Sequence, residues 1–346
     1  MKAGITIGDI NGIGIEVILK TFSDRRIFDF CTPVVYGSSK VISYHRKALK
    51  LNEFNFNTIR DINGASAQKF NVINCWQEDV IIDLGKATET SGLYSLKSID
   101  AALVDLKAGK IDYLVTAPVN KHKVPVENFR GHTEYLATAF GTDSWLMMMT
   151  SENLRIGLVT EHVPLSQVPA TLTVELIVKK IKVFNNSLVK DFGIRKPKIA
   201  VLGLNPHAGE NGTIGTEESE KIIPAINRAK DDGRHIFGPY SGDGFFGASL
   251  HLKFDGILAM YHDQGLIPFK LLAFENGVNY TAGLPVIRTS PDHGTAFDIA
   301  GAGVASESSF RQALLTGAAI VKNRKFHGDI TANPLKTATL EKEMQQ

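Results

Sequence analysis

The chain has 346 residues, of which 43% are hydrophobic and 21% are charged, and its formal net charge is +2. This length favours about two domains over one small core. A nearly neutral chain without a basic tract gives no sign of nucleic acid or of an anionic membrane as a partner. The longest apolar stretches, such as 145–149, are far shorter than the roughly 20 residues that a bilayer-spanning helix needs. We therefore expect an ordinary globular protein with no membrane span.

The first ten residues contain neither a long apolar core nor a cleavage site of small residues, so they do not resemble a secretory signal. We expect the protein to stay in the cytoplasm. Cys31 and Cys75 occur outside any paired motif, which argues against a disulfide framework and against a thiolate metal site.

Short apolar runs alternate with helix-like stretches along nearly the whole chain, a pattern typical of βα units around a mainly parallel sheet. The expected elements of the first part are a strand over 2–7, a glycine-bearing turn over 8–14 leading into a helix from about 15, a strand over 33–36, a helix from Ser38 or Ser39 with a serine hydroxyl as its cap, a helix over 90–109 capped by Gly109, and a strand over 112–116. Segment 51–80 is rich in Asn and predicts no particular structure.

The second part of the chain continues the alternation. Its expected elements are strands over 154–159, 199–204 and 257–260, helices over 173–190 and 217–229, closing helices over about 309–321, and a frayed tail after Pro334. We place the first α/β domain at 1–130 plus 284–346 and the second at 131–283, so that the first domain contains both ends of the chain.

Three histidines lie just after these three strands, in turns unlike their surroundings. They are His162, His207 and His262. Ligands bind at the carboxyl ends of the strands in an open α/β sheet, so the three imidazoles can meet there. Three neutral imidazoles and an open position are typical of a catalytic Zn²⁺-type site. A lone histidine beside a strand is more often structural, but the prolines and glycines of these turns favour metal binding.

Polar residues are dense after the third histidine. They are Asp263, Gln264, Lys270, Asn279, Arg288 and the segment 292–298. Basic side chains among Gly and Pro turns suit carboxylate or phosphate groups, which predicts a small anionic substrate. The alternative is that Lys270 and Arg288 lie on surface loops. The glycine turn 8–14 lacks the G-x-G-x-x-G spacing, and the chain has no P-loop, so neither nucleotide motif is predicted.

Five motifs in order resemble one family. They are Thr116-Ala-Pro-Val-Asn-Lys121, Gly131-His-Thr-Glu134, Asn205-Pro-His-Ala-Gly-Glu210, Tyr261-His-Asp-Gln-Gly265 and Gly283-Leu-Pro-Val-Ile-Arg-Thr-Ser290. From the first strand to about Gly303, the chain resembles the 4-hydroxythreonine-4-phosphate dehydrogenases of vitamin B6 synthesis. The resemblance implies an isopropylmalate dehydrogenase-like fold of two α/β/α domains with mainly parallel sheets. It also implies an active site in the interdomain cleft, at the interface of a homodimer.

The same resemblance assigns roles to individual residues. His162, His207 and His262 match the metal ligands, which come from both subunits in that family, and the imidazole donors favour Zn²⁺, with Co²⁺ and Mg²⁺ as alternatives. The residues that match the substrate contacts are His132, Thr133, Lys270, Asn279 and Arg288. The residues that match the nucleotide loop are Asp292, His293, Gly294, Thr295 and Asp298. The implied cofactor is NAD, with NADP as an alternative, and the chain is expected to be inactive as a monomer.

The implied reaction is oxidation of 4-phosphooxy-L-threonine to a β-keto acid, which loses CO₂ to give 3-amino-2-oxopropyl phosphate. The sequence leaves the general base undecided among Asp243, Asp263 and Lys270, and His132 remains a further candidate. The first turn departs from the family pattern, since Ile10, Asn11 and Ile15 replace two prolines and an alanine.

Three other functions stay open at this point. A related enzyme could oxidise another phosphorylated hydroxy acid, such as threonate or erythronate 4-phosphate, with the same metal and cofactor. A metal-dependent hydrolase would also use three histidines and a bound water. A third alternative is a non-catalytic protein in which the ion only joins two subunits.

Overall fold

A computed structural model describes residues 1–333 of the chain. The strands are β1 Lys2–Thr6, β2 Thr32–Gly37, β3 Asn57–Ile59, β4 Asn71–Asn74, β5 Tyr113–Thr116, β6 Leu146–Thr150, β7 Arg155–Leu158, β8 Lys198–Leu202, β9 His235–Tyr240, β10 Gly256–Ala259, β11 Val278–Ala282 and β12 Arg288–Pro291. The helices are α1 Gly14–Ser23, α2 Ser39–Ala48, α3 Glu89–Lys107, α4 His132–Ala139, α5 Val168–Thr171, α6 Val174–Lys190, α7 Ile223–Asp231, α8 Gly242–Gly247, α9 His262–Ala273 and α10 Ser308–Thr331.

The strands form one continuous sheet in the order β3-β4-β2-β1-β5-β12-β11-β6-β7-β10-β8-β9. Neighbouring strands run parallel except at three central pairings, β12 with β11, β11 with β6, and β6 with β7. The predicted α/β class with a mainly parallel sheet is confirmed. The expectation of separate sheets is corrected, because the pairing of β12 with β11 carries hydrogen bonds across the predicted domain boundary. The domain boundaries stay a prediction.

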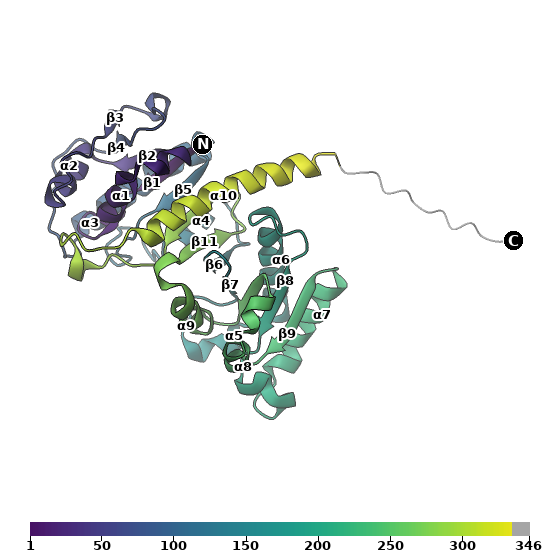
Figure 1. Cartoon of the computed structure of the whole chain (residues 1–346). Coiled ribbons are helices and arrows are strands. Elements are labelled where there is room, and N and C mark those ends of the chain that lie inside the picture. Colours follow the sequence, from purple (N-terminus) through teal and green to yellow (C-terminus); the bar gives the residue numbers. More distant parts are fainter. Residues whose placement is uncertain (334–346) are drawn as a thin grey trace.

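Figure 1 shows the two halves of the molecule, with α10 passing between them. Helix α10 packs on β5, β11 and β12 and also contacts α1 and α6. Its apolar face is buried through Phe310, Ala313, Leu314, Gly317 and Ala318. The predicted closing helices are therefore one helix that extends beyond 321. The predicted fraying after Pro334 lies outside the described residues.

Local signals explain where several helices begin and end. Thr88 and Ser91 form a reciprocal capping box at the start of α3, and Gly109 follows this helix with φ of 66°, as expected for a left-handed cap. The expected serine cap of α2 is wrong, because no Ser38 cap bond forms and Asn74 Oδ1 instead accepts from Ser39 N at 2.7 Å. The unassigned segment 51–80 contains β3 and β4, which extend the edge of the sheet.

The predicted helix over 217–229 has an irregular start. Its first turn is the π-helical turn η5 Glu218–Ile222, which leads into α7. Single π-turns inside helices occur frequently at functional sites. Within residues 1–333, no helix combines the length and the apolar character that a membrane span requires.

A buried polar network joins α10 to the second half. Arg324 Nε donates to Asp191 Oδ1 at 2.7 Å, and Tyr280 OH donates to the other carboxylate oxygen at 2.7 Å. Arg324 also donates to Tyr280 OH and to the carbonyl of Leu284. Asp191 follows α6 and Tyr280 lies on β11, so three elements meet at one ion pair.

Replacing Arg324 with Ala should leave the Asp191 carboxylate buried without its cation. Loss of one partner of a buried pair costs about 3 to 5 kcal/mol, and urea unfolding would measure this loss. The control is Lys325→Ala on the same helix, where the side chain is exposed and the expected change is within about 0.5 kcal/mol. Equal stabilities of the two variants would contradict the role given to the network.

Candidate active site

Three neighbouring parallel strands carry the predicted metal ligands. The sheet order β7-β10-β8 brings the carboxyl ends of these strands together, and His162, His262 and His207 follow them in the chain. Parallel strands present their carboxyl ends at one edge of the sheet, where ligands bind in open α/β folds. The three strands that precede the histidines therefore end at one edge of the sheet, as the sequence pattern predicts.

Two of the three imidazoles face each other within one chain. The ring centroids of His162 and His262 are 5.9 Å apart. With Zn–N bonds of about 2.0 to 2.1 Å, two imidazoles on one ion have centroids roughly 5 to 6 Å apart. His262 Nδ1 lies 2.7 Å from Asp263 Oδ1, a carboxylate contact of the kind that orients ligating histidines through their second ring nitrogen. The donors and the spacing of this pair fit a divalent ion.

Within residues 1–333, His207 does not form a close group of three ligands with that pair. It lies in the turn η4 Pro206–Gly212, and its nearby charge helps to lower the pKa of Asp243, although the hydrogen bond from Ser241 contributes more. Within residues 1–333, the group of three potential ligands whose atoms lie within 4.8 Å of one another is Glu134, Glu161 and His162, and not the three histidines. The described part of a single chain therefore does not bring all three predicted imidazoles within 4.8 Å of one another.

Glu134 and Glu161 are site residues that the sequence did not single out. Glu134 Oε1 lies 3.7 Å from His162 Nδ1. Glu161 lies 3.6 Å from Lys180 Nζ, which donates to the carbonyl of Trp145 at 2.8 Å. Burial raises the pKa of Glu161 and lowers the pKa of Lys180, while their mutual attraction opposes both shifts. Glu134 is the last residue of one of the family motifs. The pairing of Glu161 with Lys180 joins residues that are distant in sequence, so no spacing rule predicts it.

Arg288 is the most buried basic group of the predicted substrate contacts, with 4% of its surface exposed. Its Nε and Nη2 donate to Thr116 Oγ1 at 3.0 and 2.7 Å. Within residues 1–333, it forms no ion pair, and the attraction of Glu134 only partly offsets the burial that lowers the pKa of Arg288 to about 10. The guanidinium remains protonated at neutral pH. A buried cation without a carboxylate partner suits an anionic ligand.

His132 and Thr133 lie close to this cation, at the start of α4. Thr133 Oγ1 and Arg288 Nη1 both contact Thr281 Oγ1, at 3.2 and 3.4 Å. Burial lowers the pKa of His132 well below its usual value, and the charges of Arg288 and Lys121 act in the same direction. His132 Nε2 is buried and has no hydrogen-bond partner within residues 1–333. The neutral ring can therefore hydrogen-bond a ligand, but it is a poor proton acceptor at neutral pH.

Lys270 and Asn279 approach from the second half. Lys270 Nζ lies 4.0 Å from Asp292 Oδ2, at the start of the predicted nucleotide loop. Burial raises the pKa of Asp292, and the charges of Lys270 and His262 oppose that shift. Asn279 Oδ1 is buried without a hydrogen-bond partner in the described chain. Lys270 thus connects α9, which begins at His262, with the predicted cofactor loop.

The general-base candidates occupy two places. Asp263 and Lys270 lie on α9, with Asp263 bonded to His262. Asp243 lies on α8, accepts a hydrogen bond from Ser241 and neighbours His207. The choice of base stays open among these three.

The predicted nucleotide loop rests on the glycine turn of the first strand. Ile13 N donates to the carbonyl of Thr295 at 3.0 Å, and a Cβ at Gly12 would lie 2.8 Å from that same oxygen. His293 Nε2 is buried and lacks a partner in the described residues. The glycine turn 8–14 has no nucleotide motif of its own. Its backbone nevertheless packs against the predicted nucleotide loop 292–298 and supports it.

Asn11, one of the departures in that turn, ties a third segment to it. Its Nδ2 donates to the carbonyl of Lys86 at 2.9 Å and to Thr88 Oγ1 at 3.3 Å, while its Oδ1 accepts from Asp83 N at 2.9 Å. Gly85 N donates to the carbonyl of Asn11 at 2.9 Å. A Cβ at Gly85 would lie 2.9 Å from the carbonyl of Phe297, so segment 83–88 packs directly on the predicted nucleotide loop.

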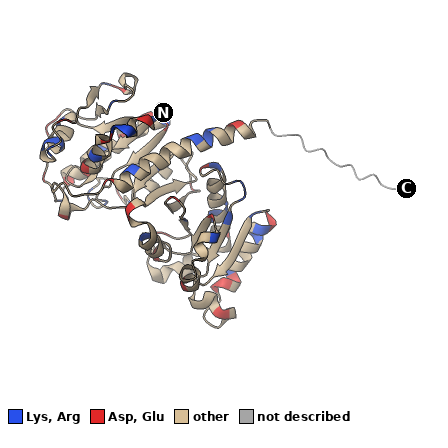
Figure 2. Ribbon diagram, viewed as in Figure 1, with Lys and Arg blue, Asp and Glu red and all other residues tan. Residues whose placement is uncertain are grey.

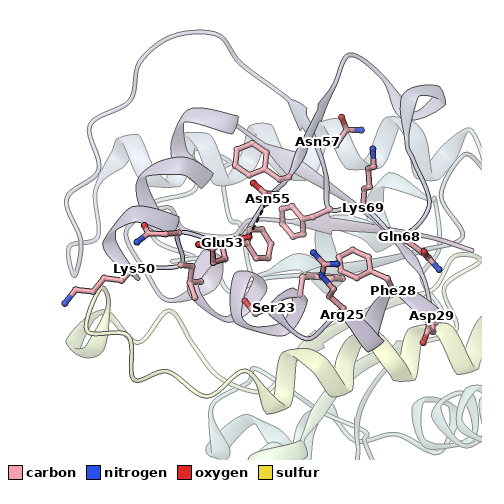
Figure 3. Close-up of a pocket in the computed structure, with 16 residues that line it drawn as sticks. Ser23, Arg25, Phe28, Asp29, Lys50, Glu53, Asn55, Asn57, Gln68 and Lys69 are labelled. Carbon is pink, nitrogen blue, oxygen red and sulfur yellow. Dashed lines mark hydrogen bonds between the residues drawn. The ribbon is translucent and has the colours of Figure 1, made fainter.

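A cavity in the first half lies away from these residues. It has a volume of about 930 Å³, and its lining residues, all between 22 and 70, include none of the predicted site residues (Figure 3). Packed phenylalanine rings form part of its wall, with Phe54 and Phe70 centroids 5.1 Å apart. Figure 2 shows acidic and basic residues on helices of both halves, in keeping with the absence of a basic tract.

Comparisons with known proteins match this chain over most of its length. Residues 29–317 match the sequence profile of the family described as Pyridoxal phosphate biosynthetic protein PdxA. A 4-hydroxythreonine-4-phosphate dehydrogenase of Bacteroides thetaiotaomicron is 48% identical over 345 residues, which cover 99% of this chain and 94% of that protein. A protein of Oceanobacillus iheyensis, provisionally named D-threonate 4-phosphate dehydrogenase, is 39% identical over 90% of this chain and 95% of its own length.

A solved structure is similar as well. The crystal structure of 4-hydroxythreonine-4-phosphate dehydrogenase from Klebsiella pneumoniae has a TM-score of 0.78 and 35% sequence identity, and the match covers 92% of this chain and 99% of that one.

Replacing Asn11 with Ala should release segment 83–88 from the glycine turn. The part-buried amide of Asp83 loses its acceptor, which costs about 1 kcal/mol, and hydrogen exchange of the amides at 83–88 should become faster. Mass spectrometry would measure that exchange, with Asn63→Ala as an exposed control. Unchanged exchange at 83–88 would show that Asn11 does not hold the segment.

Proposed function

This chain belongs to the PdxA family of pyridoxal phosphate biosynthetic proteins, and we propose that it is an NAD-dependent, divalent-metal-dependent oxidoreductase acting on 4-phosphooxy-L-threonine. The observation that carries the proposal is the 48% identity over 345 residues to a 4-hydroxythreonine-4-phosphate dehydrogenase. The product is a β-keto acid that loses CO₂ to give 3-amino-2-oxopropyl phosphate. A hydrolase would leave the docked loop at 293–298 without a role.

The two anionic groups of this substrate meet complementary side chains. The buried Arg288 supplies a fixed cation without an internal ion pair, and Lys270 supplies a second one that is half exposed. The unpartnered His132 Nε2 and Asn279 Oδ1 supply further hydrogen-bonding atoms in the same region. These groups would fix the orientation of the phosphate and carboxylate, so that the hydroxyl carbon faces the cofactor loop.

We propose that His162 and His262 of one chain hold the divalent ion together with His207 of a second copy. The 5.9 Å spacing of the first pair supports this division, and so does the absence of a close group of all three histidines within residues 1–333. When bound, the ion stabilises negative charge on the substrate oxygen, and the nicotinamide nucleotide accepts the hydride. The imidazole donors favour Zn²⁺ over Mg²⁺, with Co²⁺ as a close alternative.

Helix α9 supports the proposal of a homodimer. Ile267, Leu271 and Phe274 at its end lie three and four residues apart, with 66%, 85% and 71% of their surfaces exposed. Residues at this spacing form one helical face, and an apolar face of this kind marks an interaction surface. Because α9 begins at His262, a second copy on this face would lie beside the histidine pair.

A second candidate is oxidation of D-threonate 4-phosphate, which is favoured by the name of the relative from Oceanobacillus iheyensis. The two substrates differ at one position, where threonate carries a hydroxyl in place of the amine. Metal and cofactor would be the same in both reactions.

Purified, metal-replete protein mixed with 4-phosphooxy-L-threonine and NAD⁺ should form NADH, which absorbance at the nicotinamide band would follow. Chelation should abolish the signal, and added Zn²⁺ or Co²⁺ should restore it, because the ion stabilises charge that develops during oxidation. D-threonate 4-phosphate, assayed in parallel, should give a kcat/KM at least about tenfold lower, a difference of roughly 1.4 kcal/mol.

A higher kcat/KM with D-threonate 4-phosphate would replace the substrate and keep the reaction class. Turnover that is insensitive to chelation would contradict the metal site, and failure to bind any nicotinamide nucleotide would favour the hydrolase.

A further inference from the structure

The turn that carries His207 has an unusual backbone. Residues 207–211 all have positive φ, with values of 53°, 51°, 80°, 41° and 55°. Of these five residues, Gly209 alone lacks a side chain. Other L residues enter the left-handed region at a steric cost, and normally as single residues. A run of this kind persists only where its surroundings hold it in place.

A buried carboxylate supplies that restraint. Glu218 is 3% exposed, and its Oε1 accepts hydrogen bonds from Leu204 N and Asn205 N, both at 2.7 Å. Its Oε2 accepts from Asn205 Nδ2 at 2.9 Å. Within residues 1–333, no lysine or arginine forms an ion pair with this carboxylate. The negative charge of Glu218 is therefore stabilised by hydrogen-bond donors of residues 204–205, which lie directly before the left-handed turn.

The turn is also built close around this carboxylate. A Cβ at Gly209 would lie 2.6 Å from Glu218 Oε2, and a Cβ at Gly203 would lie 3.1 Å from Glu218 Oε1. Both glycines therefore permit a close approach that a side chain would block. Because Glu218 begins the π-helical turn η5, the irregular start of α7 and the left-handed turn meet at this side chain.

We propose that Glu218 is a positioning residue for His207. The carboxylate of Glu218 accepts hydrogen bonds from the backbone amides of 204–205 and so holds the following turn in its left-handed form. The turn in turn fixes the direction of the His207 imidazole at the edge of the sheet. Within residues 1–333 the three histidines do not form a close group, so the backbone of its own turn must fix the direction of His207. The inference rests on the proposed role of His207 in binding a divalent ion.

The test is a titration of the metal-free protein with Co²⁺, followed by the visible d–d absorption bands and by competition with a chelator. Glu218→Gln keeps the size of the side chain but replaces one acceptor oxygen with a donor nitrogen. Carboxylates that support a ligating histidine typically contribute about 10- to 100-fold in metal affinity, so we expect at least about tenfold weaker binding and an altered spectrum. Hydrogen exchange of the amides at 204–213 should become faster.

Glu217→Gln is the matched control. Glu217 precedes Glu218 in the chain and accepts from Asn205 Nδ2 at 2.7 Å, but it accepts from no backbone amide of 204–205. Its variant should bind Co²⁺ within about twofold of the unmodified protein. If Glu218→Gln fails to fold, Glu218→Asp decides, because it keeps the negative charge but shortens the side chain, so that the carboxylate no longer reaches the two backbone amides as closely. We expect this variant to weaken Co²⁺ binding to an intermediate degree.

Wild-type affinity and an unchanged spectrum in Glu218→Gln, or in Glu218→Asp where the first does not fold, would overturn the inference and leave the proposed function intact. Absence of Co²⁺ binding by the unmodified protein would instead overturn the proposed metal site, and this inference with it.

Discussion

Backbone pairing through β12 and β11 is the constraint on which the rest of the structure depends. Strand β12 pairs with β5 on one side and with β11 on the other, and β11 continues to β6. The sheet therefore passes without a break from the half that contains the predicted nucleotide loop to the half that contains the histidines. Arg288 begins β12 at this junction, which explains why its guanidinium is buried and yet close to both parts of the site.

Carboxylate side chains contact the segments that carry the predicted site residues and help to hold these segments in place. Asp191 anchors α10 through Arg324, Glu218 holds the turn of His207, and Asp263 contacts His262. In contrast, within residues 1–333 Arg288 bonds only to neutral hydroxyls and has no carboxylate partner, and His132 Nε2 has no hydrogen-bond partner. Buried polar groups are normally satisfied, so unmatched ones at the junction of two halves are the groups that a phosphorylated, carboxylated substrate would satisfy.

Much of the fold could be predicted from sequence because apolar runs and glycines are local signals. The strands before the three histidines and the cap at Gly109 follow from such patterns. The cap of α2 by Asn74 and the support of His207 by Glu218 depend on contacts between distant segments, which no spacing rule contains. The continuous sheet was missed for the same reason, since short strands such as β11 and β12 pair antiparallel across the predicted boundary.

The central claim is that two copies of this chain share each site, with His162 and His207 contributed by different copies. Mixing the inactive variants His162→Ala and His207→Ala, after dissociation and reassembly, tests it most directly. Random pairing makes half of the dimers hybrid, and each hybrid has one site without either substitution, so roughly a quarter of wild-type activity should return. If both histidines act within one chain, every site in the mixture carries a defect. Activity that stays at the level of the separate variants would therefore contradict the account.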